Sequence, residues 1–344
     1  MKKYLLHTIL TIALLFSSCT HKELCYHHPH TTKARINVDW SKFTKETPSG
    51  MTVMIYPQSG RPVIRHTSNT ISHAIVDLEA DMYNTIVFNQ SESEFLTITF
   101  KDMDRFETAE VSLNNTESKW YTSRANDDKL VMQPEWIATD AQTDGVVTPE
   151  MVEITGNELL ANKQLQSRTT TEFVIASHVP RNIIQTINVK VYIDGIHNLR
   201  SARASLDGLA EGYSLAQRKT TDVQATQLLE SWSITYNDND PTKGFITARI
   251  TSLGLPYSHS EKADENEFIL SLLLVDNKTI IDAPFLVGDK LEKVYDENGD
   301  VIELNLELRL SDALPDVQPA GSSSSGFDAI VDEWGDEENI DMEL

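Results

Sequence analysis

Cys19 is the residue whose position most directly predicts chemistry. Two serines precede it, and residues 4–16 form an apolar run of 13 residues behind a basic start. This order is typical of a secretory signal peptide. The run is too short to remain as a membrane helix, which takes about 20 apolar residues. Small residues directly before a cysteine are typical of a bacterial lipobox, although Phe16 stands where leucine is preferred. We therefore expect removal of residues 1–18 and acylation of the Cys19 thiol.

An acylated Cys19 would tether the protein to a membrane outside the cytoplasm. Each buried CH₂ group contributes about 0.8 kcal/mol, and two or more chains make such an anchor stable. The predicted location is the outer membrane. The alternative is an ordinary secreted protein with an unmodified cysteine.

A second cluster of metal-binding residue types follows in the predicted tether, residues 19–33. It contains Cys25, His21, His27, His28 and His30. A thiol and imidazoles can bind a soft divalent metal, but adjacent histidines beside a proline do not match the defined ligand spacing of zinc sites. We expect a polar spacer and no metal. With Cys19 acylated, Cys25 has no disulfide partner in the chain.

Asp296, Asn298 and Asp300 have the spacing of calcium ligands, but the glycine is at the fourth position of the segment and not at the sixth. Asn-Gly between alternating runs is instead the strongest short hairpin signal. We expect a hairpin turn.

The sequence contains no nucleophile elbow, phosphate-binding glycine loop or His-Glu-x-x-His motif. We therefore predict no enzyme activity and no cofactor. A catalytic triad assembled in space from separate segments stays open.

Four tryptophans could stack on sugars. Trp40 and Trp232 lie at inward positions of predicted strands, so we expect them in the core. Trp120 and Trp136 lie in an irregular segment, which leaves them as candidate glycan contacts.

The elements that must position these residues are β-strands. Ala34, Ile36, Val38 and Trp40 alternate with polar residues, the period of a half-buried strand. Short strand patterns recur at residues 52–56, 75–78, 83–88, 95–100 and 107–113. A helix start at residues 148–150 is interrupted by Gly156.

A second β-rich region begins with the alternating residues 187–193. Patterns at 232–236, 245–250, 291–295 and 301–310 follow, and the nearly continuous apolar run 268–275 predicts a central strand buried on both faces. Residues 315–326 are typical of a flexible linker. The predicted units are a signal peptide (1–18), a tether (19–33), two β-sandwich domains (34–160 and 165–312) and a tail (313–344).

The composition argues strongly against nucleic acid as a partner. Lys and Arg number 29 against 52 Asp and Glu, so the formal net charge is −23. Nucleic-acid binding needs a basic footprint. The same charge disfavours adsorption to anionic lipid heads, so membrane contact is expected through the acyl group.

The tail ends on a strand pattern. Ile340, Met342 and Leu344 alternate with acidic residues, and residues 327–344 carry eight acidic residues and no basic one. One interpretation is a strand that completes a sheet of its own chain or of a partner. The alternative is a disordered acidic tail that keeps the surface soluble.

Several segments together carry a family resemblance: residues 22–26, 29–30, 34–40, 197–206, 208, 211–213 and 272–276. With these segments the sequence resembles a Bacteroidales family of cell-surface lipoproteins related to anchor and accessory subunits of type V (fimbrillin) pili. The resemblance implies two tandem transthyretin-like β-sandwiches, an assembly or adhesive role, partners among fimbrial or other surface proteins, and no enzyme activity. Asp207-Gly208 permits a left-handed turn and Gly212 another, before Tyr213 packs.

Residues 20–23 are similar to the lysine-plus-acidic export signals of Bacteroidales surface lipoproteins, with one acidic residue in place of two. We therefore favour display on the outer face, with the periplasmic face as the alternative. The competing functional hypothesis is a glycan-binding surface lipoprotein of a nutrient-uptake system.

Overall fold

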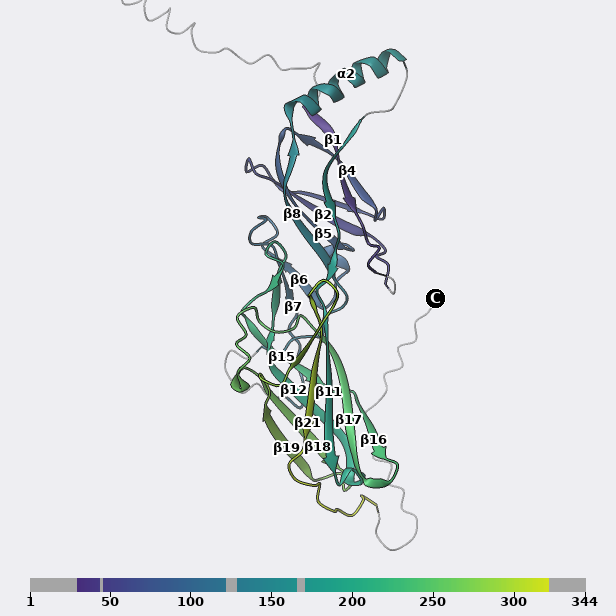
Figure 1. Ribbon diagram of the computed structural model, residues 1–344, viewed down its shortest axis with the longest axis vertical. Helices are drawn as coiled ribbons and strands as arrows, with labels where there is room; N and C mark the ends of the chain where they lie inside the picture. The colour runs from purple at the N-terminus through teal and green to yellow at the C-terminus, as the bar shows by residue number, and fades with distance from the viewer. Residues whose placement is uncertain (1–29, 44–45, 122–128, 166–170, 322–344) are drawn as a thin grey trace, which may run out of the picture.

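The computed structural model describes residues 30–43, 46–121, 129–165 and 171–321. These residues form an elongated molecule with the N-terminal strands at one end and the C-terminal strands at the other (Figure 1). Strands make up most of it, together with one α-helix and three short 3-10 helices, η1 (Glu92–Glu94), η2 (Ile196–Asn198) and η3 (Ala263–Glu265). The prediction of a mostly β protein built of several sheets is confirmed.

The N-terminal sandwich packs a three-stranded sheet, order β4-β1-β9, on a five-stranded sheet, order β10-β8-β5-β2-β3. Its strands are β1 (Thr31–Val38), β2 (Met51–Pro57), β3 (Ile64–Ser68), β4 (His73–Glu79), β5 (Asp81–Asn89), β8 (Ala138–Val147), β9 (Glu172–His178) and β10 (Arg181–Asn182). The alternation predicted for β1 is confirmed, since Ala34, Ile36 and Val38 are buried. Trp40 lies in the same core, as predicted.

Helix α2 (Pro149–Leu165) lies across the outer end of this sandwich (Figure 1). The helix continues through Gly156, so the expected interruption is wrong. Glycine costs a helix about 1 kcal/mol relative to alanine, and contact with β1 offsets that cost. The contact includes a hydrogen bond of 2.5 Å between the buried hydroxyls of Thr32 and Thr155.

A third sheet joins the two halves of the chain. It has the order β14-β13-β7-β6 and consists of β6 (Ile98–Lys101), β7 (Glu110–Leu113), β13 (Gly212–Ser214) and β14 (Lys219–Thr220). We call it the connecting sheet. Met54 of β2 and Phe88 of β5 pack in the core beneath this connecting sheet. Val53 and Val87 of the same two strands pack instead in the N-terminal core. Strands β2 and β5 are therefore covered on both faces, and each fully buried large apolar side chain stabilises the fold by about 1.5–3 kcal/mol.

The C-terminal sandwich packs a five-stranded sheet, order β16-β17-β11-β21-β20, on a four-stranded sheet, order β15-β12-β18-β19. Its strands are β11 (Gln185–Asp194), β12 (Leu199–Ala210), β15 (Gln224–Leu229), β16 (Trp232–Asn237), β17 (Asp240–Ser252), β18 (Glu267–Leu274), β19 (Ile280–Leu286), β20 (Glu292–Tyr295) and β21 (Val301–Arg309). Trp232 packs against its core, as predicted. The domain limits 34–160 and 165–312 stay a prediction. By pairing, β9 and β10 join the N-terminal sheets, and β11 is the first strand of the second sandwich.

Strand β18 corrects one expectation. It is central, between β12 and β19, but only one of its faces is fully buried. Phe268, Leu270 and Leu272 face the core, whereas Ile269 and Leu273 on the outer face are half-buried. An apolar run alone does not reveal whether a second layer covers the sheet, and here the outer face is partly open.

Two glycines predicted to permit left-handed turns behave differently. Gly208 has φ of +69° at a bulge in β12, as expected. Gly212 does not have a positive φ and lies in β13, so the second left-handed turn is wrong. A Cβ there would come within 2.8 Å of Glu110 Oε1 and 3.0 Å of Val111 O. Gly212 thus allows β13 and β7 to approach closely. Tyr213 packs against the core of the connecting sheet, as predicted.

Candidate functional site

A groove beside Trp120 is formed where residues from the N-terminal half lie on the C-terminal sandwich. We call residues 114–121 and 129–133 the strap. Within it Thr116 N donates to Leu130 O and Met132 N to Asn114 O, both at 2.9 Å. The strap also pairs with the edge strand β15, where Val131 N donates to Thr226 O at 3.0 Å. It therefore covers an edge of the four-stranded sheet with backbone hydrogen bonds.

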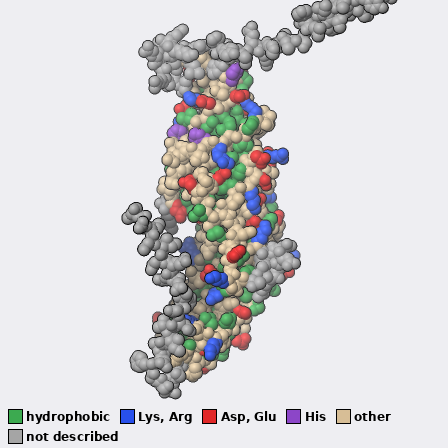
Figure 2. Space-filling model, turned by 180° about the vertical axis from the view of Figure 1, so that it is seen from behind, with side chains coloured by type: hydrophobic (Ala, Val, Ile, Leu, Met, Phe, Trp, Pro, Cys, Tyr) green, Lys and Arg blue, Asp and Glu red, His purple; other side chains and the backbone are tan. Residues whose placement is uncertain are grey.

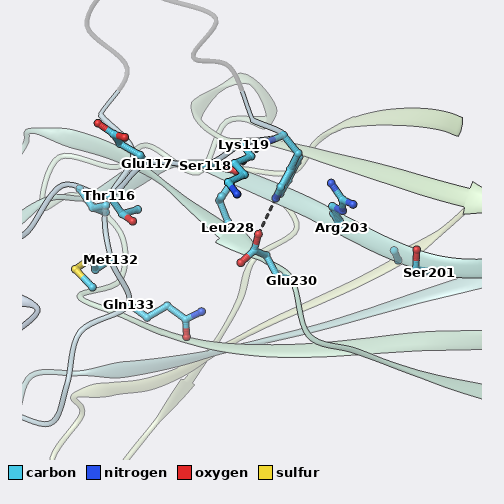
Figure 3. A pocket seen from close by; sticks show the side chains of 13 residues that line it. Thr116, Glu117, Ser118, Lys119, Met132, Gln133, Ser201, Arg203, Leu228 and Glu230 are labelled. Carbon is cyan, nitrogen blue, oxygen red and sulfur yellow. Dashed lines mark hydrogen bonds between the residues drawn. The ribbon is translucent and has the colours of Figure 1, made fainter. Parts of the chain in front are cut away.

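The groove lies between the strap and the outer face of β12 and β15 and has a volume of about 780 Å³ (Figure 3). Its apolar lining residues are Trp120, Val131, Met132, Ala202 and Leu228. Its polar lining residues are Thr116, Glu117, Ser118, Lys119, Gln133, Ser201, Arg203 and Glu230. The groove thus combines an apolar surface with hydrogen-bond donors and acceptors.

Trp120 is held in one orientation in the wall of this groove. Its indole Nε1 donates to Glu230 Oε1 at 2.6 Å, the contact drawn as a dashed line in Figure 3. The guanidinium carbon of Arg203 lies 5.5 Å from the ring centroid, a cation–π distance. Tyr121 meets the ring edge-on at 6.0 Å between centroids. Because Arg203 lies over one face of the ring, a ligand can stack only on the opposite face.

Trp136, the other candidate glycan contact, lines a different groove. It packs against the N-terminal core, and its ring meets Phe43 edge-on at 5.4 Å. This second groove, of about 740 Å³, lies where the β20–β21 turn approaches the N-terminal sandwich. The structure therefore does not bring Trp120 and Trp136 together into one site.

The β20–β21 turn is a hairpin, as predicted for residues 296–300. Asp296 Oδ1 accepts the backbone N–H groups of Asn298 and Asp300 at 2.8 and 2.9 Å. The Asn298 side chain and these backbone donors hold the pKa of Asp296 below its ordinary value. Across the junction Asp300 pairs with Arg181 at 2.7 Å, and Asn298 accepts from Lys42 at 3.1 Å. These carboxylates are engaged in the turn and in domain contacts, and the described residues contain no cluster of three metal-binding side chains.

Tertiary folding assembles one catalytic-looking constellation that the sequence reasoning did not locate. His178 Nε2 lies 2.9 Å from Thr85 Oγ1, and its Nδ1 lies 3.0 Å from Asp140. Burial alone would raise the pKa of Asp140, but the hydrogen bond with His178 and the charge of Arg218 hold it below its ordinary value. Thr85 and His178 are each only 1% exposed. Because the hydroxyl and the imidazole are both buried, we interpret the cluster as a structural contact between strands. Arg218, from the C-terminal half, adds an ion pair to Asp140 at 3.4 Å.

Residues 18–230 match the family described as a domain of unknown function, DUF5119. The chain belongs to this family.

Relatives of this DUF5119 chain are named as fimbrial and adhesin proteins. A Bacteroides ovatus protein named "Putative fimbrium anchoring subunit Fim4B" is 21% identical over 97% of this chain and 96% of its own length. A crystal structure from Bacteroides ovatus, described as that of "a putative adhesin", has a TM-score of 0.55 at 14% identity and covers 88% of this chain and 99% of its own. The fimbrial anchor protein Mfa2 from Porphyromonas gingivalis has a TM-score of 0.43 at 12% identity, over 81% and 90% of the two chains. The likeness to Fim4B confirms the resemblance to fimbrial anchor proteins predicted from the sequence.

The remaining predicted site residues of this DUF5119 member, Cys19, Ile340, Met342 and Leu344, lie outside the described residues. The structure does show where the chain enters and leaves the fold. Residue 31 begins β1 beside α2, and residue 320 is bound at the opposite end, where Ala320 N donates to Val275 O at 2.9 Å (Figure 1). In the described part of the chain no helix is long and apolar enough to cross a membrane.

Proposed function

We propose that the chain is a fimbrium-anchoring subunit, held on the outer membrane through acylated Cys19 and displayed on the outer face. The likeness to Fim4B over 97% of this chain and 96% of the relative carries the proposal, because it extends through both sandwiches and the segments that flank them. Each sandwich would then be of the transthyretin-like type. The role is structural and adhesive, with no enzyme activity, and the relatives' names are consistent with it.

The position of the predicted lipid tether at one end of the elongated fold supports an anchoring role. Strand β1 begins at residue 31, 12 positions after Cys19. Twelve extended residues span at most about 40 Å. A lipid at Cys19 would therefore keep the α2 end of the molecule close to the membrane. The C-terminal sandwich, at the other end of the long axis, would be presented away from it (Figure 1).

The chain also leaves the fold on the side away from the tether, which suits contact with a fimbrial partner. We propose that Ile340, Met342 and Leu344 form a strand that adds to a sheet edge, either of a partner subunit or of this chain. An exposed edge offers main-chain donors and acceptors to an incoming strand. The alternative, a solvated acidic tail, predicts no such pairing.

Replacing the anchoring thiol tests the function. In the native cell, Cys19→Ala is expected to move the protein from the membrane to the soluble fraction and to release fimbriae into the medium, because the polymer loses its attachment. Membrane fractionation and quantification of shed fimbriae measure both effects. On intact wild-type cells, added protease is expected to remove the protein.

Cys25→Ala is the matched control, since it removes the other cysteine of the chain and is expected to leave anchoring unchanged. Membrane retention of Cys19→Ala equal to wild type would contradict lipidation. Normal retention of fimbriae on cells that have lost the protein from their membranes would contradict the anchoring role. Full protection from protease would place the protein on the periplasmic face.

A further inference from the structure

Trp120 is set apart from the other tryptophans in the described part of the chain. Trp40 lies in the N-terminal core, and Trp136 and Trp232 pack against a core. Trp120 belongs to none of the three hydrophobic clusters, yet its ring is oriented by Glu230 and flanked by Arg203. A large ring held in place without joining a core points to a role at the surface.

Covering the sheet edge does not explain this ring. The edge strand β15 is already paired by the strap backbone, through Val131 N to Thr226 O and Thr226 N to Lys129 O at 3.0 and 2.8 Å. The indole lies beyond those bonds, over the outer face of β12. That face stays partly open, because among the described residues no further layer covers β12 and β18 there.

The charges along the groove are balanced, in contrast to the whole chain. Glu117 and Glu230 are matched by Lys119 and Arg203, whereas the formal net charge of the chain is −23. Figure 2 shows the molecule from behind relative to Figure 1, and acidic and basic side chains are interspersed on the face that it draws. A balanced groove has no excess field to attract a polyanion or a strongly basic peptide. The electrostatics therefore favour an uncharged ligand.

We propose that the Trp120 groove binds an uncharged oligosaccharide. The indole face opposite Arg203 supplies an apolar plane for the C–H face of a pyranose ring. Glu117, Gln133 and Ser201 supply the acceptors and donors that neighbouring sugar hydroxyls require. The volume of about 780 Å³ lies within the range of about 300–1,000 Å³ that is usual for ligand sites. The groove is open at the surface, so it can take a few units of a longer chain.

Binding by the detergent-solubilised full-length mature protein tests the proposal. The probes are dextran, mannan, xylan, galactan and chitin oligomers, with polygalacturonate as the anionic comparison, in affinity electrophoresis followed by calorimetry. At least one neutral probe is expected to bind. Trp120→Ala is expected to weaken that binding about tenfold or more, because central aromatic contacts carry much of the energy of a binding site.

Two further variants separate loss of the site from loss of the fold. Ser201 is exposed on β12 and lines the groove, so Ser201→Trp is expected to block binding while the thermal midpoint stays near wild type. Tyr257→Ala removes an exposed aromatic ring outside the groove and is expected to bind as wild type. The proposal would be overturned if the wild-type protein bound none of the probes or bound only polygalacturonate. It would also be overturned if the Trp120→Ala and Ser201→Trp variants bound a neutral probe with the same affinity as the wild-type protein. Anchoring does not enter any of these readouts, so the fimbrial role and this site can fail separately.

Discussion

At the scale of single residues, Glu211 ties the connecting sheet together. It lies between β12 and β13 and is 6% exposed. Its carboxylate accepts hydrogen bonds from Lys129 Nζ at 2.6 Å and Ser112 Oγ at 3.0 Å, and Lys101 Nζ lies 3.6 Å away. One buried carboxylate thus connects the strap, β7 and β6 to the C-terminal half.

Glu211 is expected to make stability depend on acid pH. Burial alone would raise its pKa, but the bonds from Lys129 and Ser112 hold the pKa below its ordinary value. A lowered folded-state pKa gives stability that is present above the unfolded-state pKa and lost as pH falls through the folded-state pKa. Glu211→Gln is therefore expected to lower the free energy of unfolding by about 1–3 kcal/mol at pH 7. Its difference from wild type should shrink below about pH 4.5. Denaturant unfolding at pH 7 and between pH 5 and 3 measures both.

Glu107→Gln is the control, because this glutamate is exposed on the loop that precedes β7. It is expected to leave stability near wild type at every pH. A Glu211→Gln deficit that stays constant from pH 7 to pH 3 would show that the carboxylate acts through packing and not through its charge.

At the scale of elements, the bulge in β12 depends on the backbone of Gly208. Its φ is +69°, and an added Cβ would overlap the carbonyl oxygen of Glu265 and approach Asn266 Nδ2 at 2.6 Å. Gly299, in the β20–β21 turn, has φ of +82° with nothing within 4 Å of the same position. The two glycines share the left-handed backbone and differ only in crowding.

Replacing Gly208 and Gly299 separately with alanine is expected to distinguish the cost of a positive φ from the cost of steric overlap with the added Cβ. Gly299→Ala should cost about 1 kcal/mol, the price of a left-handed backbone with a side chain. Gly208→Ala should cost more, about 2–4 kcal/mol, because the backbone around Glu265 must also move. Chemical denaturation of both variants provides the measurement. Equal losses would mean that β12 shifts freely at the bulge.

At the scale of the whole molecule, the tail follows residue 320, which lies at the end of the fold opposite the predicted lipid tether (Figure 1). Truncation after Ala320 is expected to lower thermal stability or to remove a co-purifying partner, because a strand that completes a sheet contributes main-chain hydrogen bonds and apolar contacts. Differential scanning calorimetry and affinity purification from the native cell measure the two outcomes.

Changing Ile340, Met342 and Leu344 together to serine is the matched control, since it removes the apolar face and keeps the length and charge of the tail. If the strand interpretation is correct, this variant behaves like the truncation. A truncated protein with wild-type stability and all its partners would leave the tail as a solvated acidic end.

Local physics let the sequence alone determine several features of this protein. Alternation with a period of two identified β1 and β11, because successive side chains of a strand point to opposite faces. Asn298-Gly299 predicted the β20–β21 hairpin, and Gly208 predicted a left-handed backbone at its position in β12, because few residues tolerate a positive φ. These signals are carried by neighbouring residues, so no knowledge of the fold is needed to read them.

Tertiary structure decided which distant segments meet. Pairing of β7 with β13, and the parallel pairing of β1 with β9, join residues far apart in the chain. The alternation of apolar and polar residues identifies a strand but not the strand with which it pairs. Pairing is selected by burial of the apolar faces of all the strands together. For the same reason only the fold could separate Trp120 from Trp136, leave the outer face of β18 partly open, and enclose Thr85, His178 and Asp140 together. Each of these outcomes depends on which layer covers a strand, and that choice minimises exposed apolar area over the whole molecule and not over any one segment.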